Sequence, residues 1–146
     1  MKRAHVIRWI TNRAGDIVRH VRIAYLRQTG IQIGRNCMIS MGAKLDVRRG
    51  KIIIGDNCTI THGCVVLSHD RSARRIDRTD DGEGIVRLGK NVFVGVNAVV
   101  LRNVTIGDNS VVGAGAIVAT SLPPNVVVVG NPARIVRELS TKDHSP

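Results

Sequence analysis

A six-residue period runs through the sequence from residue 88 to residue 124. Every sixth position is aliphatic, and the column consists of Leu88, Val94, Val100, Ile106, Val112 and Val118. Neither the 3.6-residue period of an α-helix nor the two-residue period of one strand generates such a column. Three positions after each aliphatic residue comes a residue type that readily adopts positive φ, namely Asn91, Asn97, Asn103, Asn109 and Gly115. The pattern predicts a parallel β-helix, in which each short strand is followed by a turn and each hexad stacks on the next coil.

The same period extends toward the N-terminus in two earlier sets. These are Ile33, Ile39 and Leu45, followed by Ile54, Ile60 and Val66. The spacing between the sets predicts a small bulge near residues 48–51 and a loop excursion over residues 68–86. We therefore divide the chain into an N-terminal cap (1–30), a β-helix of about four coils (31–132) and a C-terminal segment with its tail (133–146).

All three cysteines, Cys37, Cys58 and Cys64, fall at the small inward position of their hexads. This placement predicts reduced core residues rather than a disulfide or a metal site.

The first 28 residues break the six-residue pattern and read as a basic amphipathic helix. One helical stripe contains Ile7, Ile10, Ala14, Ile17, Val18, Val21 and Tyr25. Two readings remain open: the stripe caps the open end of the first coil, which we favour, or the helix lies on an anionic membrane surface. Charged residues interrupt any apolar run, so we expect neither a signal peptide nor a membrane span. The expected location is the cytoplasm, including the inner membrane face.

The formal net charge of +11 indicates an anionic partner. Aromatic residues make up only 2% of the chain, which disfavours nucleic acid because aromatic platforms for base stacking are scarce. At the other end, Pro123 and Pro124 end the regular coils. Val126 to Val129 then add one last strand, a short helical segment is expected after Pro132, and residues 141–146 are expected to form a loose tail.

Several motifs in the second half of the chain carry a family resemblance. They are Asn91-Val92-Phe93-Val94-Gly95, Val104-Thr105-Ile106-Gly107-Asp108-Asn109, Val112-Gly113-Ala114-Gly115 and Gly130-Asn131-Pro132-Ala133-Arg134. With them the chain resembles the hexapeptide-repeat acyltransferases over about residues 31–138. It is most similar to the group with maltose, galactoside, serine, xenobiotic and polysaccharide O-acetyltransferases.

The resemblance implies an all-β, left-handed parallel β-helix and a homotrimer with active sites between subunits. It also implies acetyl-CoA as acyl donor and no metal. The expected activity is transfer of an acetyl group to a sugar hydroxyl in a polysaccharide precursor, glycolipid or nucleotide sugar, as in polysaccharide biosynthesis. The alternatives are N-acetylation of an amino sugar, a serine or antibiotic acetyltransferase, and a non-catalytic scaffold.

His69 is the candidate general base. It stands at the turn position where the excursion opens, and Ser68-His69-Asp70 resembles the site in the family where a histidine at the start of such a loop takes the proton of the acceptor. Asp70 is the candidate for orienting the imidazole. His62, at an outward position, is read as a solvated or interface residue, because a zinc site of three histidines has no third candidate nearby.

Donor and acceptor residues are assigned mainly through the resemblance. The donor positions that match the family are Phe93, Gly95, Ala114, Ala119, Thr120, Arg134 and Arg137, with the two arginines meeting the phosphates of coenzyme A. Phe93 replaces a common Trp, and Ala119-Thr120 replaces a frequent Thr-Lys pair. The excursion is expected to act as a lid, in which Arg71, Arg74 and Arg75 contact an anionic group of the acceptor, and Asp46 faces the same cleft.

Overall fold

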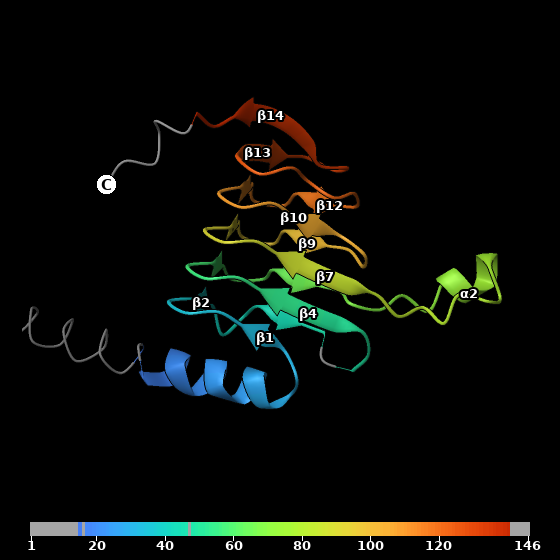
Figure 1. Cartoon of the computed structure of the whole chain (residues 1–146), viewed down its shortest axis with the longest axis horizontal. Helices are drawn as coiled ribbons and strands as arrows, with labels where there is room; N and C mark the ends of the chain where they lie inside the picture. The colour runs from blue at the N-terminus through green and yellow to red at the C-terminus, as the bar shows by residue number, and fades with distance from the viewer. Residues whose placement is uncertain (1–14, 16, 47, 141–146) are drawn as a thin grey trace, which may run out of the picture.

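The computed structural model describes residues 15, 17–46 and 48–140. The first half of the predicted N-terminal helix and the predicted loose tail at residues 141–146 lie outside the described residues. Short parallel strands stack into three sheets that form the faces of a prism (Figure 1). The predicted all-β fold, a parallel β-helix with about four full coils, is confirmed.

Each of the four full coils contributes one strand to each sheet, and two further strands extend the second sheet. The first sheet contains β1 (Gln32–Ile33), β4 (Lys51–Ile54), β7 (Ile85–Leu88) and β10 (Thr105–Ile106). The second sheet contains β2 (Met38–Ile39), β5 (Thr59–Ile60), β8 (Phe93–Val94), β11 (Val111–Val112), β13 (Val126–Val129) and β14 (Arg134–Glu138). The third sheet contains β3 (Lys44–Leu45), β6 (Val65–Val66), β9 (Val99–Val100) and β12 (Ile117–Val118).

The aliphatic column predicted from the six-residue period forms the core. Val94, Val100 and Val112 have no exposed side-chain surface, and Leu88 and Val118 are nearly as buried. Burying one such side chain stabilises the fold by about 1.5–3 kcal/mol relative to leaving it in water. The cysteines are free thiols at this core, as predicted, with Cys58 and Cys64 fully buried.

The predicted turns are also confirmed. Asn36, Asn57, Asn91, Asn97, Asn103 and Asn109 all have φ between 54° and 61°. The side chains of neighbouring coils then bond along a corner: Asn91 Nδ2 donates to Asn109 Oδ1 at 2.8 Å, and Asn109 Nδ2 donates to Asn125 Oδ1 at 3.1 Å. These amides align one turn above the next and keep the coils in register.

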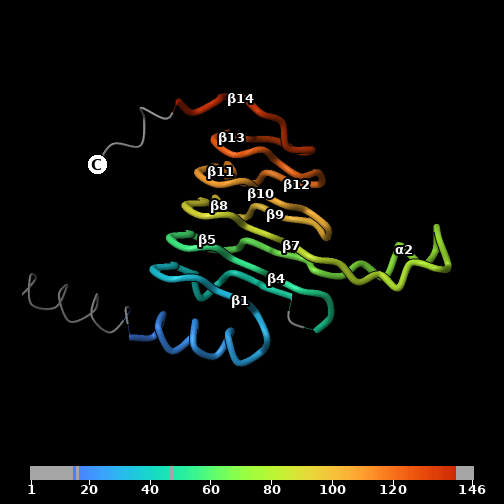
Figure 2. The backbone as a smooth tube through the Cα atoms, viewed as in Figure 1, coloured from blue at the N-terminus to red at the C-terminus, as the bar shows by residue number. Residues whose placement is uncertain are grey.

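Two insertions interrupt the regular coils where the sequence indicates. Arg87 pairs with Thr105, 18 residues later, whereas Gln32 pairs with Ile53 across 21 residues and Ile53 pairs with Arg87 across 34. The larger insertion is the excursion, which leaves after β6 and returns at β7, so its end lies at residue 84 and not 86. It projects from the prism as an arm whose two sides run together (Figure 2) and carries the one-turn helix α2 (Ala73–Ile76).

The N-terminal helix, observed at residues 15 and 17–28, lies across the first coil with a different face from the one predicted. Ile23 and Leu26 are buried in the core, whereas the predicted capping residues Ile17, Val18, Val21 and Tyr25 are 47–65% exposed. The rotation of the helix is fixed by two arginines. Arg22 donates to the carbonyls of Met41 and Ala43, and Arg27 donates to those of Ile33 and Gly34. These carbonyls belong to the first coil, which has no earlier coil to pair with.

The prediction of a short helical segment after Pro132 is wrong. Residues 134–138 form β14, which turns back and pairs antiparallel with β13, joining Val126 to Glu138 and Val129 to Arg134. The β-branched pair Ile135-Val136 favours an extended backbone. The open edge of β13 offers backbone partners to such a strand, whereas a helix this short gains too few internal bonds to form alone.

Candidate functional site

His69 lies where β6 ends and the excursion begins, and its ring is held by a carboxylate from the preceding coil. Leu45 of β3 pairs with Val66 of β6, so Asp46 and His69 emerge at the same corner of the prism. His69 Nδ1 contacts Asp46 Oδ2, and the two side chains are 16% and 5% exposed. The remaining ring nitrogen, Nε2, is therefore the one available for a reacting group.

Asp46 is itself fixed by several hydrogen bonds. Its Oδ1 accepts from the Arg48 amide at 3.2 Å, and its Oδ2 accepts from Ser68 Oγ at 3.4 Å. Burial alone would raise the pKa of the Asp46 carboxyl, but the bonds with His69 and the Arg48 amide hold that pKa below its usual value. The carboxylate is thus charged at neutral pH and favours the tautomer of His69 with its proton on Nδ1.

Asp70 does not occupy the position predicted for it. Its Oδ1 accepts hydrogen bonds from the Ser72 amide at 2.8 Å and from Ser72 Oγ at 2.7 Å, which begins the turn into α2. The contact with the imidazole that was expected of Asp70 is made instead by Asp46, which was predicted to face the acceptor cleft. The side chain of a sequence neighbour follows the local turn, whereas the stacked coil places a carboxylate beside the ring.

The base of the excursion is a short antiparallel ladder that holds His69 in place. His69 pairs with Glu83 as an isolated bridge, the Asp70 amide donates to Gly82 O, and the Gly84 amide donates to Ser68 O. Further out, the guanidinium of Arg102 bonds both carboxylate oxygens of Asp80, at 3.1 and 2.5 Å. These bonds lower the pKa of the Asp80 carboxyl. Neither Arg102 nor Asp80 was among the site residues predicted from the sequence.

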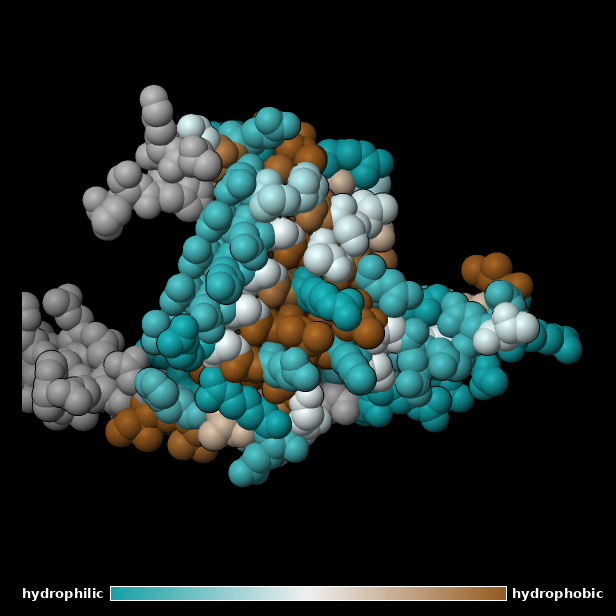
Figure 3. Space-filling model, viewed as in Figure 1, coloured by the Kyte–Doolittle hydropathy of each residue, from teal (hydrophilic) through white to brown (hydrophobic). Residues whose placement is uncertain are grey.

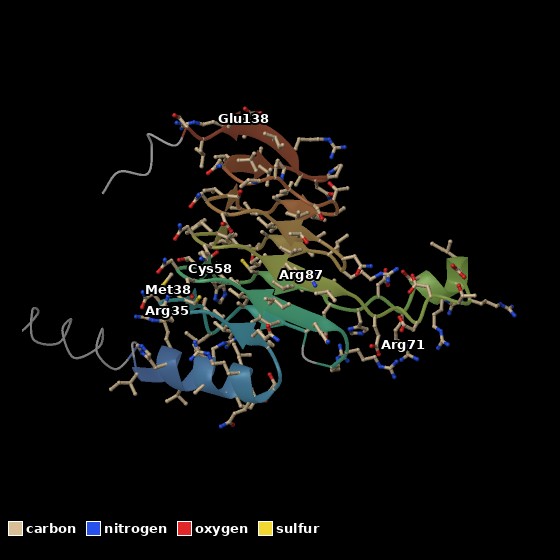
Figure 4. The ribbon with its side chains drawn as sticks, viewed as in Figure 1. Arg35, Met38, Cys58, Arg71, Arg87 and Glu138 are labelled. Carbon is tan, nitrogen blue, oxygen red and sulfur yellow. The ribbon has the colours of Figure 1, made fainter. Side chains whose placement is uncertain are left out.

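A groove of about 370 Å³ lies on the outer side of the third sheet, next to the Asp46–His69 contact. Leu45, Asp46, Val65 and Leu67 line it. The predicted acceptor residues Arg71, Arg74 and Arg75 are all exposed on the excursion, the last two on α2. Arg71 follows His69 by two residues and lies on the arm, outside the stacked coils (Figure 4). The arm thus carries cations outward from the groove.

The predicted donor residues fall into two groups. Ala119 and Thr120 follow β12 at the same corner as His69, two strand spacings or about 9.5 Å along the prism. The other group is associated with the second sheet and the corner that follows it: Phe93, Gly95, Ala114, Arg134 and Arg137. Within one chain, the third sheet therefore lies between the Ala119–Thr120 pair and the other five predicted donor residues.

Most of the second group is open to solvent, and one member has a packing role. Phe93 is 42% exposed on β8, and Ala114, Arg134 and Arg137 are also exposed. Gly95 is buried, and the next coil approaches it closely: a Cβ added there would lie 2.6 Å from the backbone nitrogen of Ala114. We therefore attribute this glycine first to coil packing.

Other reactive side chains lie away from His69. His62 is exposed at the corner between the second and third sheets, near the N-terminal helix. Within the described residues no group of three His, Cys, Asp or Glu side chains is arranged to hold a metal ion. That the protein requires no metal stays a prediction.

Family models match three segments of the chain. The bacterial transferase hexapeptide repeat matches residues 85–120, and the hexapeptide repeat of succinyl-transferase matches residues 23–46 and 51–68. The galactoside O-acetyltransferase of Escherichia coli strain K12 is 38% identical over 118 residues, which are 79% of this chain and 57% of that protein.

Solved structures give the same result. An acetyltransferase with hexapeptide repeats from Vibrio cholerae, complexed with acetyl-CoA, superposes with a TM-score of 0.67 at 32% identity, covering 75% of this chain and 61% of the other. A galactoside acetyltransferase in complex with coenzyme A also has a TM-score of 0.67, at 35% identity over 80% of this chain and 58% of the other. The chain thus spans about three fifths of the length of these relatives.

Proposed function

Because the chain belongs to the hexapeptide-repeat transferase family, we propose that it transfers an acetyl group from acetyl-CoA to a hydroxyl group. The observation that carries this proposal is the contact of His69 Nδ1 with Asp46 Oδ2, which leaves Nε2 free to act as a base. The acceptor oxygen attacks the thioester carbonyl while Nε2 takes its proton. The C–S bond then breaks, and the imidazolium returns a proton to the departing thiolate.

The donor is proposed to be acetyl-CoA, as in the complex with the Vibrio cholerae relative. Ala119 and Thr120 lie along the corner that holds His69, where the extended pantetheine arm can run past the base. Arg134 and Arg137 are exposed residues of β14 and are proposed to meet the phosphates. The phosphate-binding arginines belong to a different sheet from His69, so one chain does not bring all of these groups together.

We therefore propose a homotrimer in which two copies share each site. The outer face of the third sheet supports it, because Val65, Val99 and Ile117 there are only partly buried. A neighbouring copy packed on this face removes apolar surface from water. It also brings residues of a second chain to the groove beside His69.

The acceptor is proposed to be a sugar hydroxyl in an anionic polysaccharide precursor, glycolipid or nucleotide sugar, modified in the cytoplasm. Two observations support it: the sequence match to a galactoside O-acetyltransferase and the exposed arginines of the excursion. Arg71, Arg74 and Arg75 suit a phosphate or carboxylate on the acceptor. An amino sugar, serine or an antibiotic hydroxyl is the alternative acceptor.

The proposal is tested by measuring release of free coenzyme A from acetyl-CoA with a panel of acceptors. Anionic sugars should be acetylated by the wild type, and His69→Ala should lower turnover by roughly a hundredfold to ten-thousandfold. In both proteins acetyl-CoA should raise the melting temperature, because a ligand that binds the native state stabilises it. If millimolar acetyl-CoA changes the melting temperature of neither, the protein is a non-catalytic scaffold.

A further inference from the structure

We propose that the exposed face of the N-terminal helix binds the surface of an anionic lipid membrane. Ile23 and Leu26 on one side of the helix are 9% and 6% exposed and cap the first coil. A second apolar side is exposed beside the first coil and contains Ile17, Val18, Val21 and Tyr25. Figure 3 shows hydrophobic residues at the outer side of this end of the molecule.

This outer face is a continuous patch rather than scattered apolar residues. The four side chains and Met41 of the first coil line a shallow groove of about 560 Å³. Their exposed fractions range from 47% for Val18 to 65% for Val21. Ile23, Leu26 and the arginine contacts already cap the coil, so the exposed face is not needed to close the β-helix. Apolar surface gathered in this way marks a binding surface.

The basic residues of the N-terminal segment favour an anionic membrane as the partner of this apolar face. Residues 1–28 contain seven Lys or Arg residues, which are Lys2, Arg3, Arg8, Arg13, Arg19, Arg22 and Arg27, against the single acidic residue Asp16. Arg22 and Arg27 donate to backbone carbonyls, which leave their charge in place. An apolar helix face on a strongly basic segment is the composition of helices that lie in the surface of anionic bilayers.

A second copy of the chain fits this face less well than a bilayer. Two such helices packed face to face would bring both sets of cations together, and like charges at short distance repel. Tyr25 is also suited to the boundary between acyl chains and water, because its ring is apolar and its hydroxyl is polar. No helix among the described residues is long and apolar enough to span a bilayer. With its exposed apolar face and its basic residues, the helix is proposed to lie in the plane of the bilayer surface.

The experiment uses the full chain and phospholipid vesicles. Binding is measured by co-sedimentation with vesicles of phosphatidylcholine alone and of phosphatidylcholine with phosphatidylglycerol. Trp9, the single tryptophan, lies in the same N-terminal segment of the sequence and gives a second, fluorescence readout. We expect binding to the anionic vesicles at low salt, weaker binding in high salt and little binding to the neutral vesicles.

Two glutamate variants separate the helix face from general charge. Val21→Glu combined with Tyr25→Glu should weaken binding to anionic vesicles by roughly tenfold or more, because both changes remove apolar contact and add charge repulsion. Ile76→Glu is the matched control: its side chain is 91% exposed but lies on the excursion, so binding should not change. Melting temperatures of both variants should stay near that of the wild type, since the substituted side chains are exposed.

Three results would overturn the proposal. One is failure of the wild type to bind anionic vesicles at low salt. Another is undiminished binding of the Val21→Glu, Tyr25→Glu variant, which would indicate attraction by charge alone. The third is an oligomer that the wild type forms and the double variant cannot form, because a second copy would then cover the face.

Discussion

His69 Nδ1 contacts the carboxylate of Asp46, although 23 residues separate the two in sequence. The contact exists because β3 stacks on β6, so the residues that follow each strand meet at one corner. Asp46 is nearly buried and is also bonded by Ser68 and the Arg48 amide. The ring is thus fixed in one tautomer before any substrate arrives.

We predict that Asp46→Asn lowers turnover by roughly ten- to a thousandfold, less than the loss of His69, because the ring is then no longer held in one tautomer. Asp70→Asn is the matched control, since its carboxylate bonds Ser72 at the start of the excursion. That variant should keep turnover within about threefold of the wild type. The measurement is the steady-state turnover of both variants with the best acceptor. A larger loss of turnover in Asp70→Asn than in Asp46→Asn would assign the orienting role to Asp70.

The stability of the protein should depend on pH through Asp46. Its pKa is lowered in the folded state, so the unfolded chain binds the proton more tightly and folding weakens as the pH falls. The loss should begin near the ordinary aspartate pKa of about 3.9 and be complete below the lowered value. Other carboxylates also contribute, so the measurement is the difference in melting temperature between wild type and Asp46→Asn. We expect this difference to shrink in acid, and an equal difference at pH 7 and pH 3 would contradict the assignment.

The six-residue period predicts the coils, their turns and the burial of the cysteines, because all three follow from residues that repeat along the chain. The Asp46–His69 contact could also be inferred from the sequence, since Leu45 and Val66 are the third aliphatic residues of successive sets and pair in the structure. The prediction named Asp70 as the partner of the imidazole instead, because Asp70 is adjacent to His69 in sequence.

The errors at the two ends have a common physical cause. The helix has two apolar faces, and the contacts of Arg22 and Arg27 with coil carbonyls decide which one is buried. At the C-terminus, pairing of β14 with the edge of β13 decides between helix and strand. Both outcomes depend on contacts with residues that are distant in sequence, and a periodicity within one segment contains no information about such contacts.

Arg102 and Asp80 should control the order of the excursion. Their paired hydrogen bonds tie the arm to the corner after β9. We predict that Arg102→Gln makes the arm more susceptible to trypsin at its exposed arginines, while the prism stays intact because its core is not touched. Arg87→Gln is the control, since Arg87 is exposed on the first sheet and not on the arm (Figure 4). The prediction fails if both variants are cleaved in the arm at the same rate as the wild type.

Arg134 and Arg137 should contribute to donor binding and not to the chemical step. Contacts to the phosphates of coenzyme A are similar in the ground state and the transition state, so their loss raises KM and leaves kcat near normal. We expect Arg134→Ala and Arg137→Ala each to raise the KM for acetyl-CoA by roughly three- to thirtyfold. Arg35→Ala, which removes an exposed arginine that is paired with Asp56, is the control. A fall in kcat without a change in KM would instead place the arginines near the reacting atoms.

We predict that the acetyl group passes directly to the acceptor without an acyl-enzyme, and cysteine variants test this. The Cys58 thiol bonds with Cys37 and is buried, and both effects raise its pKa, so it forms little of the thiolate that would attack a thioester. Cys64 Sγ is fully buried and donates to Gly95 O at 3.0 Å. Cys58→Ala and Cys64→Ala should therefore retain turnover within about twofold, with a destabilisation of about 1–2 kcal/mol from the vacated space. Mass spectrometry after mixing with acetyl-CoA should find no acetylated protein. An acetylated cysteine that forms and decays at the rate of turnover would replace direct transfer with a covalent route.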